Sequence, residues 1–564
     1  MAHTVQTEIE QKFSIGDDRP VPELTGIGAV ESVEHLDPVV LEAVYYDTDS
    51  LALARRRIAL RRRQGGHDEG WHVKLPAAEG RTELQWPLAV EPPAVQQAAP
   101  SERADADTDH PEPAQTGVAT EVPQEVLDAV RVHVRDHRLT PLARISTTRA
   151  VTNLLDADGR VVIELADDRV VASDARAGVA RAWREWEVEL GEAAPGTPKK
   201  RAALLEEAAA LLLAAGAEVS PSVSKLAQAL GRTGLGGTEE QPGNAAPAAP
   251  ARTVESALTP AAAVVLAGVR DLATQIVDLD PRVRADDDDA VHRLRVVVRR
   301  LRSVLASHRA LFDDAHLDRL RDALSRLGAL LGETRDLEVR ARWAADALAE
   351  VEADRGVVDA DARRRLVDDT RAEHADAHRR LVAAMSDTPY YRLLDELDAL
   401  LDGPVPPLLS DDPSSPSSPK KFSRKVAGKE ASRALKRTVT PKHARRVDDV
   451  DPVEAARALA ALHASRKAAR RLRYTVEFAD TAPASTLGGR GERIADAAEE
   501  LQDALGWHRD ASLFADFVLL TAQRADAAGE SSFTYGVLHQ RASDQAARAL
   551  ALADDARREL RRTV

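Results

Sequence analysis

The chain has 564 residues, which is enough for several domains, each with its own hydrophobic core. Its 77 basic and 92 acidic residues give a formal net charge of −15, so binding of a polyanion would require local clusters of positive charge. The absence of cysteine excludes disulfides, thiolate metal sites and cysteine nucleophiles, and no run of about 18 apolar residues exists to span a bilayer. Because the start also lacks the apolar core of a signal peptide, we expect a cytoplasmic protein.

The first predicted strand covers residues 7–13, where TEIEQKF alternates. In a strand, Glu8, Glu10 and Lys12 share one face, and Ile9 lies on the other. Two carboxylates on one face can bind a hard cation such as Mg²⁺ or Mn²⁺, and the lysine can contact a phosphate that the metal brings. Exposed faces of edge strands are also often charged, so this motif alone leaves both interpretations open.

Charged residues recur on one face of the later strand-like segments. Segments 58–63, 71–76 and 81–88 carry the following polar residues: Arg61, Arg63, His72, Lys74, Arg81 and Glu83. Segments 161–168 and 183–190 carry mainly acids: Glu164, Glu185, Glu187 and Glu189. If the sheet closed into a barrel with these faces inward, such a lumen would be unstable when empty but would suit a metal-bound polyphosphate.

The order of these motifs resembles the CYTH family of triphosphate tunnel enzymes over residues 5–230. Residues 8–12 match the family's ExExK signature, and later landmarks follow in the same order: YYDT at 45–48, RRR at 61–63, WHVKLP at 71–76, GRTE at 80–83 and EWEVEL at 185–190. The resemblance implies an eight-stranded antiparallel β tunnel that holds a triphosphate and one or two divalent metal ions, Mg²⁺ or Mn²⁺. Water would then attack a terminal phosphoryl group.

The resemblance also implies roles for individual residues. The implied metal ligands are Glu8, Glu10, Glu164, Glu187 and Glu189. The implied catalytic group is Glu8, Glu10, Lys12, Glu187 and Glu189. The implied triphosphate contacts are Lys12, Arg61, Arg63, Lys74, Arg81, Arg144, Arg149 and Lys225. One feature departs from the family pattern: Arg144 and Arg149 are five residues apart, so in a regular strand only one faces inward.

Composition divides the chain into two domains. Residues 90–122, rich in Pro, Ala, Glu and Asp, are predicted to be a flexible insertion in a tunnel domain that covers 1–230. A helix is expected at 199–215, and a Gly/Pro/Ala linker at 231–254. From 255 to 564 the apolar pattern is helical. We therefore expect a multidomain α+β protein in which an all-α domain follows the β tunnel.

A basic segment occurs twice in the helical part. VHRLRVVVRRLRSVL at 291–305 and LHASRKAARRLRYTV at 462–476 both carry a histidine followed by arginines at +3, +7, +8 and +10. On a helix these residues form a basic stripe beside an apolar stripe. Solvation would explain one such stripe, but it does not require the same spacing twice. The motif L-x-x-x-L-G-x-x-R-D then follows at 327–336 and 501–510, which indicates an internal duplication.

The duplicated pattern resembles the CHAD family over residues 258–560. The resemblance implies two pseudo-symmetric helical-bundle halves, at about 258–402 and 452–564, that face each other across a channel for inorganic polyphosphate. The implied ligands of polyphosphate are His292, Arg295, Arg299, Arg300, Arg302, His463, Arg466, Lys467, Arg470, Arg471 and Arg473. Arginine forks suit phosphate oxygens, and a histidine surrounded by phosphates can take up a proton near neutral pH. The Arg-Asp pairs at 335–336 and 509–510 are expected to be structural ion pairs or caps.

The segment 404–450 separates the two halves and is expected to be disordered. It is Pro/Ser-rich up to 419 and strongly basic over 420–446. It is either a solvated tether or an auxiliary arm for polyphosphate or nucleic acid.

Two functions of different classes fit these patterns. The first is a divalent-metal-dependent inorganic triphosphatase that acts on tripolyphosphate or polyphosphate ends and carries a polyphosphate-binding domain. The alternative is a non-catalytic polyphosphate-binding protein targeted to polyphosphate granules. Nucleic-acid binding is less favoured, because aromatic residues make up only 3% of the chain and few lie near the arginines for base stacking.

Overall fold

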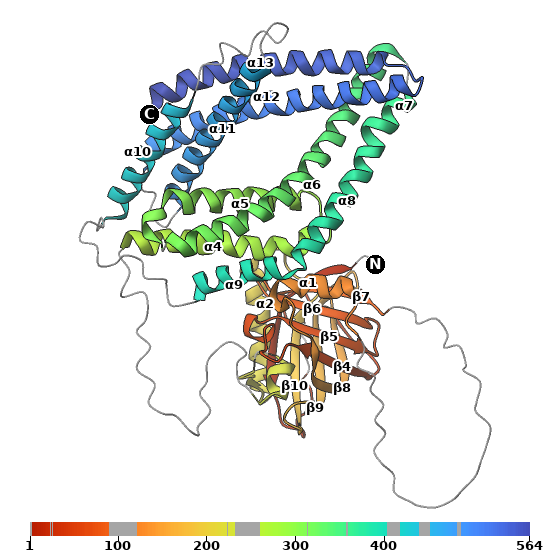
Figure 1. Cartoon of the computed structure of the whole chain (residues 1–564). Helices are drawn as coiled ribbons and strands as arrows, with labels where there is room; N and C mark the ends of the chain where they lie inside the picture. The colour runs from red at the N-terminus through yellow and green to blue at the C-terminus, as the bar shows by residue number, and fades with distance from the viewer. Residues whose placement is uncertain are drawn as a thin grey trace, which may run out of the picture. The chain divides into compact units, whose positions relative to one another are not determined.

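The chain forms two compact units, Met1–Asn244 and Ala245–Val564, in the computed structural model (Figure 1). The structure describes residues 3–22, 24, 26–88, 121–222, 224–231, 260–312, 314–356, 359–402, 418–438, 452–481 and 487–564. The predicted linker at 231–254 and the predicted insertion at 90–122 lie almost wholly outside these residues. None of the described helices combines the length and the hydropathy that a membrane crossing requires.

The first unit is built on one antiparallel sheet. Its strands are β1 (Thr4–Glu8), β2 (Glu10–Ser14), β3 (Ser32–His35), β4 (Val39–Asp47), β5 (Ala59–Gln64), β6 (Gly70–Pro76), β7 (Arg81–Pro87), β8 (Thr140–Leu155), β9 (Val161–Asp174), β10 (Val179–Leu190) and β11 (Glu218–Val219). They pair in the order β1-β7-β6-β5-β4-β8-β9-β10-β2-β11, with β3 beside β8. Only Ile9 separates β1, which pairs with β7, from β2, which pairs with β10. The segment Thr4–Ser14 therefore joins the two edges of the sheet into a tunnel.

The predicted count of eight strands is lower than the eleven that the sheet has among the described residues. Eight strands make the closed circuit when β1 and β2 are taken as one interrupted strand. The additional strands β3 and β11 are only four and two residues long. Segments this short are below the length at which an alternating pattern identifies a strand.

Two helices cover the outside of the tunnel. The helix α1 (Gln124–Val134) packs on a core around Trp71 and Trp86, and α2 (Pro198–Ala214) packs on a core around Phe13 and Trp186. Because side chains alternate between the faces of a strand, the neighbours of these apolar residues point into the lumen. This alternation is what places the charged residues inside.

A third helix closes part of the lumen. The short helix α3 (Lys225–Ala229) places Leu226 in an apolar cluster with Tyr45, Ile145 and Val170, which lie on the inner faces of β4, β8 and β9.

The turn after β4 is stabilised by Asp47. Its buried carboxylate accepts hydrogen bonds from three backbone N–H groups, those of Thr48, Leu53 and Ala54.

All elements described in the second unit are helical. The helices are α4 (Pro260–Arg284), α5 (Ala290–Ser307), α6 (Asp314–Arg355), α7 (Ala360–Arg363), α8 (Asp369–Met385), α9 (Thr388–Asp402), α10 (Pro419–Arg437), α11 (Pro452–Thr481), α12 (Gly489–Ala527) and α13 (Phe533–Thr563). The repeated basic segments form α5 and α11, which contact each other. The duplication is visible in the packing. In the first half α4 and α6 contact α5, and α8 contacts α6; in the second half α10 and α12 contact α11, and α13 contacts α12.

The helix α10 corrects the predicted disorder of 404–450. Residues 418–438 are described and helical, and they occupy the place in the second half that α4 occupies in the first. The second half therefore begins at α10 and not at 452. The apolar residues Phe422, Val426, Ala431 and Ala434 recur every three to five positions and are buried, but the high charge of the segment hid this stripe.

Candidate functional site

The lumen of the tunnel has a basic wall and an acidic wall. Strands β5, β6 and β7 carry the basic wall: Arg61, Arg63, Lys74 and Arg81. Strands β2, β9 and β10 carry the acidic wall: Glu10, Glu164, Asp168, Glu185, Glu187 and Glu189. Glu8 lies at the end of β1, beside Arg81 in the register with β7.

Strand register sets three carboxylates in one row across the acidic wall. Glu189 on β10 pairs with Glu10 on β2 and with Glu164 on β9. Like charges directly opposite one another on a sheet face are destabilising unless a cation compensates them. Burial and the nearby Glu8 raise the pKa of Glu189 to about 7. Among the described residues, Lys12, whose ammonium lies 3.0 Å from Glu10, is the cation that forms an ion pair with this row, and a divalent cation would supply further positive charge.

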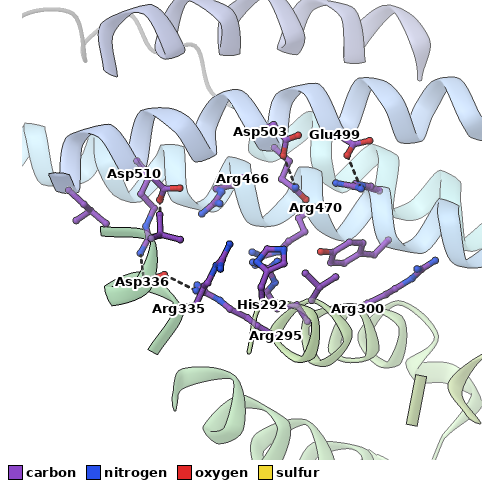
Figure 2. A pocket seen from close by; sticks show the side chains of 18 of the residues that line it. His292, Arg295, Arg300, Arg335, Asp336, Arg466, Arg470, Glu499, Asp503 and Asp510 are labelled. Carbon is purple, nitrogen blue, oxygen red and sulfur yellow. Dashed lines mark hydrogen bonds and ion pairs between the residues drawn. The ribbon is translucent and has the colours of Figure 1, made fainter. Parts of the chain in front are cut away.

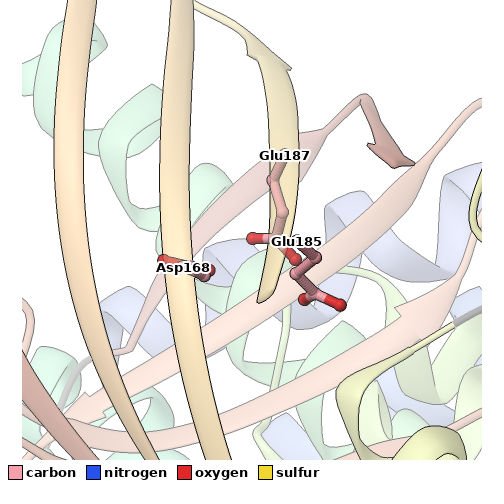
Figure 3. A group of neighbouring side chains, drawn as sticks. All are labelled: Asp168, Glu185 and Glu187. Carbon is pink, nitrogen blue, oxygen red and sulfur yellow. The ribbon is translucent and has the colours of Figure 1, made fainter. Parts of the chain in front are cut away.

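A second group of carboxylates lies beside α3 (Figure 3). Oxygens of Asp168, Glu185 and Glu187 lie within 4.8 Å of one another. The ammonium of Lys225 lies 2.9 Å from Asp168 and 2.6 Å from Glu185, and it also binds Glu187. Against the desolvation that burial imposes, these carboxylates raise the pKa of Lys225 above its usual range. The lysine thus takes the place that a metal would need, so this group fits a metal less well than the row around Glu189.

Glu187 is held by three cations. Its carboxylate accepts hydrogen bonds from Lys12 and Lys225 and, at 2.6 Å, from Arg149. Against the cost of burial, these cations hold its pKa well below the usual range. The structure therefore brings Glu187 into the lumen but surrounds it with positive charge.

The basic wall is also paired with carboxylates of the lumen. The Lys74 ammonium donates to both oxygens of Glu8, at 2.6 and 2.9 Å. Arg61 lies 3.4 Å from Glu83, and Nδ1 of His72 lies 2.9 Å from the same carboxylate. Burial lowers the pKa of His72 to about 4, so this histidine is neutral at physiological pH. A phosphate that binds Lys74 or Arg61 would therefore replace a carboxylate partner.

The second candidate site is a pocket between four helices of the helical unit (Figure 2). Its cavity of about 630 Å³ lies among α5, α6, α11 and α12. The lining includes His292 and nine arginines: Arg295, Arg299, Arg300, Arg335, Arg340, Arg466, Arg470, Arg473 and Arg509. It also includes five carboxylates: Asp336, Glu477, Glu499, Asp503 and Asp510. The lining therefore carries an excess of four positive charges when His292 is neutral.

The repeated L-x-x-x-L-G-x-x-R-D motif holds the central arginines of the pocket. A Cβ atom at Gly506 would lie 3.1 Å from the Arg466 guanidinium, and one at Gly332 would lie 3.7 Å from that of Arg295. Arg295 donates to the carbonyl of Gly332 at 3.3 Å and to Asp336 at 2.7 Å. The glycine gives the arginine room to cross α6, and the aspartate fixes its position.

The pocket arginines repel one another. Burial, together with the positive charge of Arg299, lowers the pKa of Arg470 to about 10. Burial and neighbouring arginines also lower the pKa values of Arg299 and Arg466. A pKa lowered in this way means that the folded chain holds positive charge at a cost, which an anion between these residues would relieve. His292 lies in the same environment, and burial and Arg335 lower its pKa.

Comparisons with known proteins assign both units. Residues 6–219 match the CYTH domain and residues 267–519 match the CHAD domain. An uncharacterized protein found in two strains of Mycobacterium tuberculosis is 35% identical over 571 residues, which covers 99% of this chain and 97% of that protein. The chain belongs to the CYTH–CHAD two-domain family. Its membership supports a role connected with triphosphates or polyphosphates, and CYTH members depend on metal ions.

Two solved structures each match about half of this chain. PptA from Streptomyces chartreusis is 20% identical, with a TM-score of 0.41, and the match covers 53% of this chain and 99% of PptA. The CHAD domain of the plant Ricinus communis is 26% identical, with a TM-score of 0.38, and the match covers 53% of this chain and 91% of that domain.

Arg144 does not lie in the CYTH tunnel. It pairs in register with Val44, whose side chain packs with Trp71 in the outer core, and Arg144 is exposed. Arg149, in contrast, reaches Asp168 inside the lumen at 2.7 Å. Five residues of extended strand place the two arginines on opposite faces, so the implied phosphate contact at Arg144 is wrong.

Two residues of the CYTH site, Asp168 and Arg57, were not predicted from the sequence. Asp168 was not chosen, although it lies four positions after Glu164 and the alternation puts both on one face. Arg57 lines a cavity of about 620 Å³ together with Arg81, Glu10 and Lys12. No sequence signal marks Arg57, because its direction follows from a left-handed backbone with φ of 59° after a turn of 3₁₀-helix, Ala54–Arg56.

Four of the residues implied for polyphosphate do not line the CHAD pocket: Arg302, His463, Lys467 and Arg471. His463 and Lys467 are exposed, and Arg302 lies next to Gly328 of α6. Arg471 donates to the carbonyl of Ala306 and, at 2.8 Å, to Glu430 of α10. The two copies share their spacing, but each copy meets different neighbours, so equivalent arginines do not all face the same space.

The expected ion pairs of the repeated Arg-Asp motif are present in a different arrangement. Asp336 pairs with Arg295 of α5, while Arg335 pairs with Glu338 at 2.7 Å. Arg509 lies 3.4 Å from Asp510. Both motifs also line the pocket, so they are structural and contribute to its charge.

Proposed function

We propose that the CYTH tunnel hydrolyses inorganic tripolyphosphate, or the ends of longer chains, with a divalent metal ion, and that the CHAD pocket binds polyphosphate. The observation that supports this function best is the row of Glu10, Glu189 and Glu164 opposite a wall of arginine and lysine. One wall suits a metal ion and the other suits phosphate oxygens. A metal-bound triphosphate satisfies both walls at once.

Glu8, Glu10, Glu164 and Glu189 would hold the metal. An Mg²⁺ or Mn²⁺ ion bound there would polarise phosphoryl oxygens and neutralise charge that develops during hydrolysis. Glu187 is assigned a different role, because its three cationic partners, Lys12, Arg149 and Lys225, already balance its charge. Glu187 would orient these cations toward the end of the triphosphate that lies nearest α3.

Binding of phosphate and binding of metal are coupled through Lys74. Its ammonium contacts both oxygens of Glu8. When a phosphate takes Lys74 as its partner, it frees the carboxylate of Glu8 for the metal. Arg61 and Glu83, 3.4 Å apart, provide a second exchange of this kind on the same wall. Substrate and metal therefore enter most favourably together.

The apolar cluster around Leu226 supports action on chain ends. It fills the lumen beside α3 with Tyr45, Ile145 and Val170. These side chains offer no donor for phosphate oxygens except the Tyr45 hydroxyl, which already lies 3.4 Å from Arg61. A phosphate chain would thus stop at this end of the tunnel, with its terminal phosphoryl group near Arg149 and Lys225.

The test is a panel of substrates and metals with the full chain. Phosphate release is measured from tripolyphosphate, ATP, pyrophosphate and long polyphosphate, each with Mg²⁺ and with Mn²⁺. The double variant Glu10→Gln with Glu189→Gln should lose at least about 100-fold in rate, since it removes charge that the metal needs. Glu218→Gln, an exposed glutamate of β11, serves as the control and should retain full activity. Equal rates in the double variant and the control would refute the assignment.

A second candidate function is polyphosphate binding without catalysis. Its support is the CHAD pocket, where nine arginines face five carboxylates with no need for a metal. Such a protein would bind polyphosphate and associate with polyphosphate granules, while releasing no phosphate from any triphosphate in the panel. Retention on immobilised polyphosphate should then depend on Arg466 and Arg470 and not on Glu10 or Glu189.

A further inference from the structure

The side chains of α10 fall into three groups: buried apolar residues, one buried carboxylate and exposed basic residues. Its apolar residues are buried, and the ring of Phe422 lies tilted against that of His308 of the first half, with ring centroids 5.9 Å apart. Ala427, Ala431 and Ala434 belong to a core that α10 shares with α11 and α12. This packing fixes which face of the helix is left outside.

The only acidic residue of α10 is buried. Glu430 is 2% exposed, and its carboxylate accepts hydrogen bonds from Arg471 at 2.8 Å and Arg433 at 3.3 Å. Its negative charge is therefore used inside the domain. It does not offset the positive charge on the outer face.

The outer face of α10 is purely basic. Its exposed charged residues are Lys420, Lys421, Arg424, Lys425, Lys429, Lys436 and Arg437. Among the residues that the structure describes, no carboxylate forms an ion pair with any of these seven. Like charges at adjacent helical positions destabilise a helix, so this face has an energetic cost that a bound polyanion would remove. At about 1.5 Å per residue, the 19 residues of α10 extend over about 28 Å.

This basic face is separate from the CHAD pocket. No residue of α10 lines the pocket, and α11 lies between the two. Arg466, Arg470 and Tyr474 of α11 face the pocket, whereas Leu472 and Val476 belong to the core on the α10 side. A chain that fills the pocket therefore does not by itself cover α10.

We propose that the exposed face of α10 is a second polyphosphate-binding surface, which binds long chains and leaves short ones to the pocket. The inference rests on the polyphosphate binding proposed above for the CHAD domain. A linear phosphate chain needs only a row of cations, and α10 provides one. Nucleic acid fits less well, because the only aromatic residue of α10, Phe422, is buried and offers no surface for base stacking.

Two surfaces on one domain change how chain length affects affinity. Once the pocket holds one part of a long chain, the rest of the chain is at a high effective concentration near α10. A tripolyphosphate has no such second part. Removal of charge from α10 should therefore weaken binding of long chains and spare short ones.

The experiment compares two variants of the full chain with four charges removed from each. The first is Lys421→Gln, Lys425→Gln, Lys429→Gln and Lys436→Gln on α10. The control is Arg326→Gln, Arg392→Gln, Arg524→Gln and Arg548→Gln, which are exposed arginines on other helices of the same unit. Circular dichroism and thermal unfolding establish that both variants are folded. Affinity is then measured by fluorescence anisotropy for polyphosphate of about 100 units and by calorimetry for tripolyphosphate, over a range of salt concentrations.

The α10 variant should lose at least about 10-fold in affinity for the long chain, with a shallower dependence of log K on log salt. Its tripolyphosphate affinity and hydrolysis should match those of the wild type, and the control should stay within about twofold. An unchanged long-chain affinity would overturn the proposal. If the α10 variant lost binding of single-stranded RNA but kept its affinity for long polyphosphate, the proposal would be overturned and the surface would be assigned to nucleic acid.

Failure of this inference is distinguishable from failure of the proposed function. Arg466→Ala with Arg470→Ala tests the pocket and should weaken both short and long chains. If that variant behaves as expected and the α10 variant does not, the pocket stands and the second surface is refuted. If neither variant affects binding, polyphosphate binding by the CHAD domain is refuted as well.

Discussion

The CYTH tunnel and the CHAD pocket balance their charges in opposite ways. In the tunnel several cations have carboxylate partners, as Lys74 has Glu8 and Lys225 has Asp168. In the pocket, arginines outnumber carboxylates and lower one another's pKa values, as at Arg470. In the row around Glu189 the imbalance is negative, and burial and Glu8 raise the pKa of that carboxyl to about 7.

This difference indicates what each site requires from its ligand. A triphosphate alone would add negative charge to a lumen that already contains a row of carboxylates, so the proposed hydrolysis would require a metal ion together with the substrate. The pocket lining has more arginines than carboxylates, so the pocket can bind an anion without a metal ion. Under the proposed function, the same class of ligand would therefore be held in two ways within one chain.

The largest expected effect comes from removal of metal. Treatment with EDTA should reduce phosphate release from tripolyphosphate by at least about 100-fold, because the carboxylate row then repels the substrate. Polyphosphate affinity of the Glu10→Gln, Glu189→Gln variant, in which the pocket is unaltered, should not change with EDTA. Release from tripolyphosphate that persists in EDTA would contradict the division between the two sites.

Lys225 tests whether the tunnel balances its own charges. Lys225→Met leaves Asp168, Glu185 and Glu187 without their shared cation, which should lower the free energy of unfolding of the CYTH unit by about 3–5 kcal/mol. Urea unfolding followed by tryptophan fluorescence measures this change. Added Mn²⁺ should restore part of the stability, since the three carboxylates then converge on an open cation site. Lys199→Met, on the exposed start of α2, is the control.

The pocket arginines should contribute to affinity without metal. Arg295→Ala or Arg466→Ala should each weaken polyphosphate binding by about 10- to 100-fold, as expected for a charged hydrogen bond worth about 1.5–3 kcal/mol. The affinity is measured by titration calorimetry at fixed salt. Arg342→Ala, an exposed arginine of α6, should leave it unchanged. Equal losses in all three variants would mean that only net charge matters and the pocket does not.

The smallest expected effect is the pH dependence of pocket binding. Burial and Arg335 keep the pKa of His292 below its ordinary value, so it is neutral at pH 7. Bound phosphate would raise that pKa, so binding takes up a proton and strengthens as pH falls between the two values. Calorimetry in buffers of different ionisation enthalpy should detect this uptake and a change in affinity of a few fold between pH 8 and pH 6. His292→Gln should abolish the uptake, whereas His463→Gln, outside the pocket, should retain it.

Local patterns in the sequence predicted the main elements well. Alternation placed Glu8, Glu10 and Lys12 together. In the structure Lys12 contacts Glu10 and Glu187, and Glu8 contacts Lys74, so all three lie in the lumen. The spacing of Arg144 and Arg149 predicted that only one faces inward, and the structure shows that it is Arg149. The same reasoning would have found Asp168, had the alternation been followed to the end of its strand.

Other features depended on contacts between distant segments. The charge of 418–438 predicted disorder, but burial of Phe422 and Ala434 against α11 makes this segment a helix. The +8 arginines of the two repeats have equal spacing, yet Arg300 lines the pocket and Arg471 turns to Glu430 of α10. Neither outcome is encoded within a window of neighbouring residues.

The sequence by itself determined the strand faces, the duplication and the family, because each depends on periodicity or on the order of motifs along the chain. Only the tertiary structure decided which carboxylates remain for a metal, which arginines face the pocket and which face of α10 stays exposed. These depend on the partner that each charge meets in space. A charged side chain is available to a ligand only where the fold has not already given it a neighbour of opposite sign.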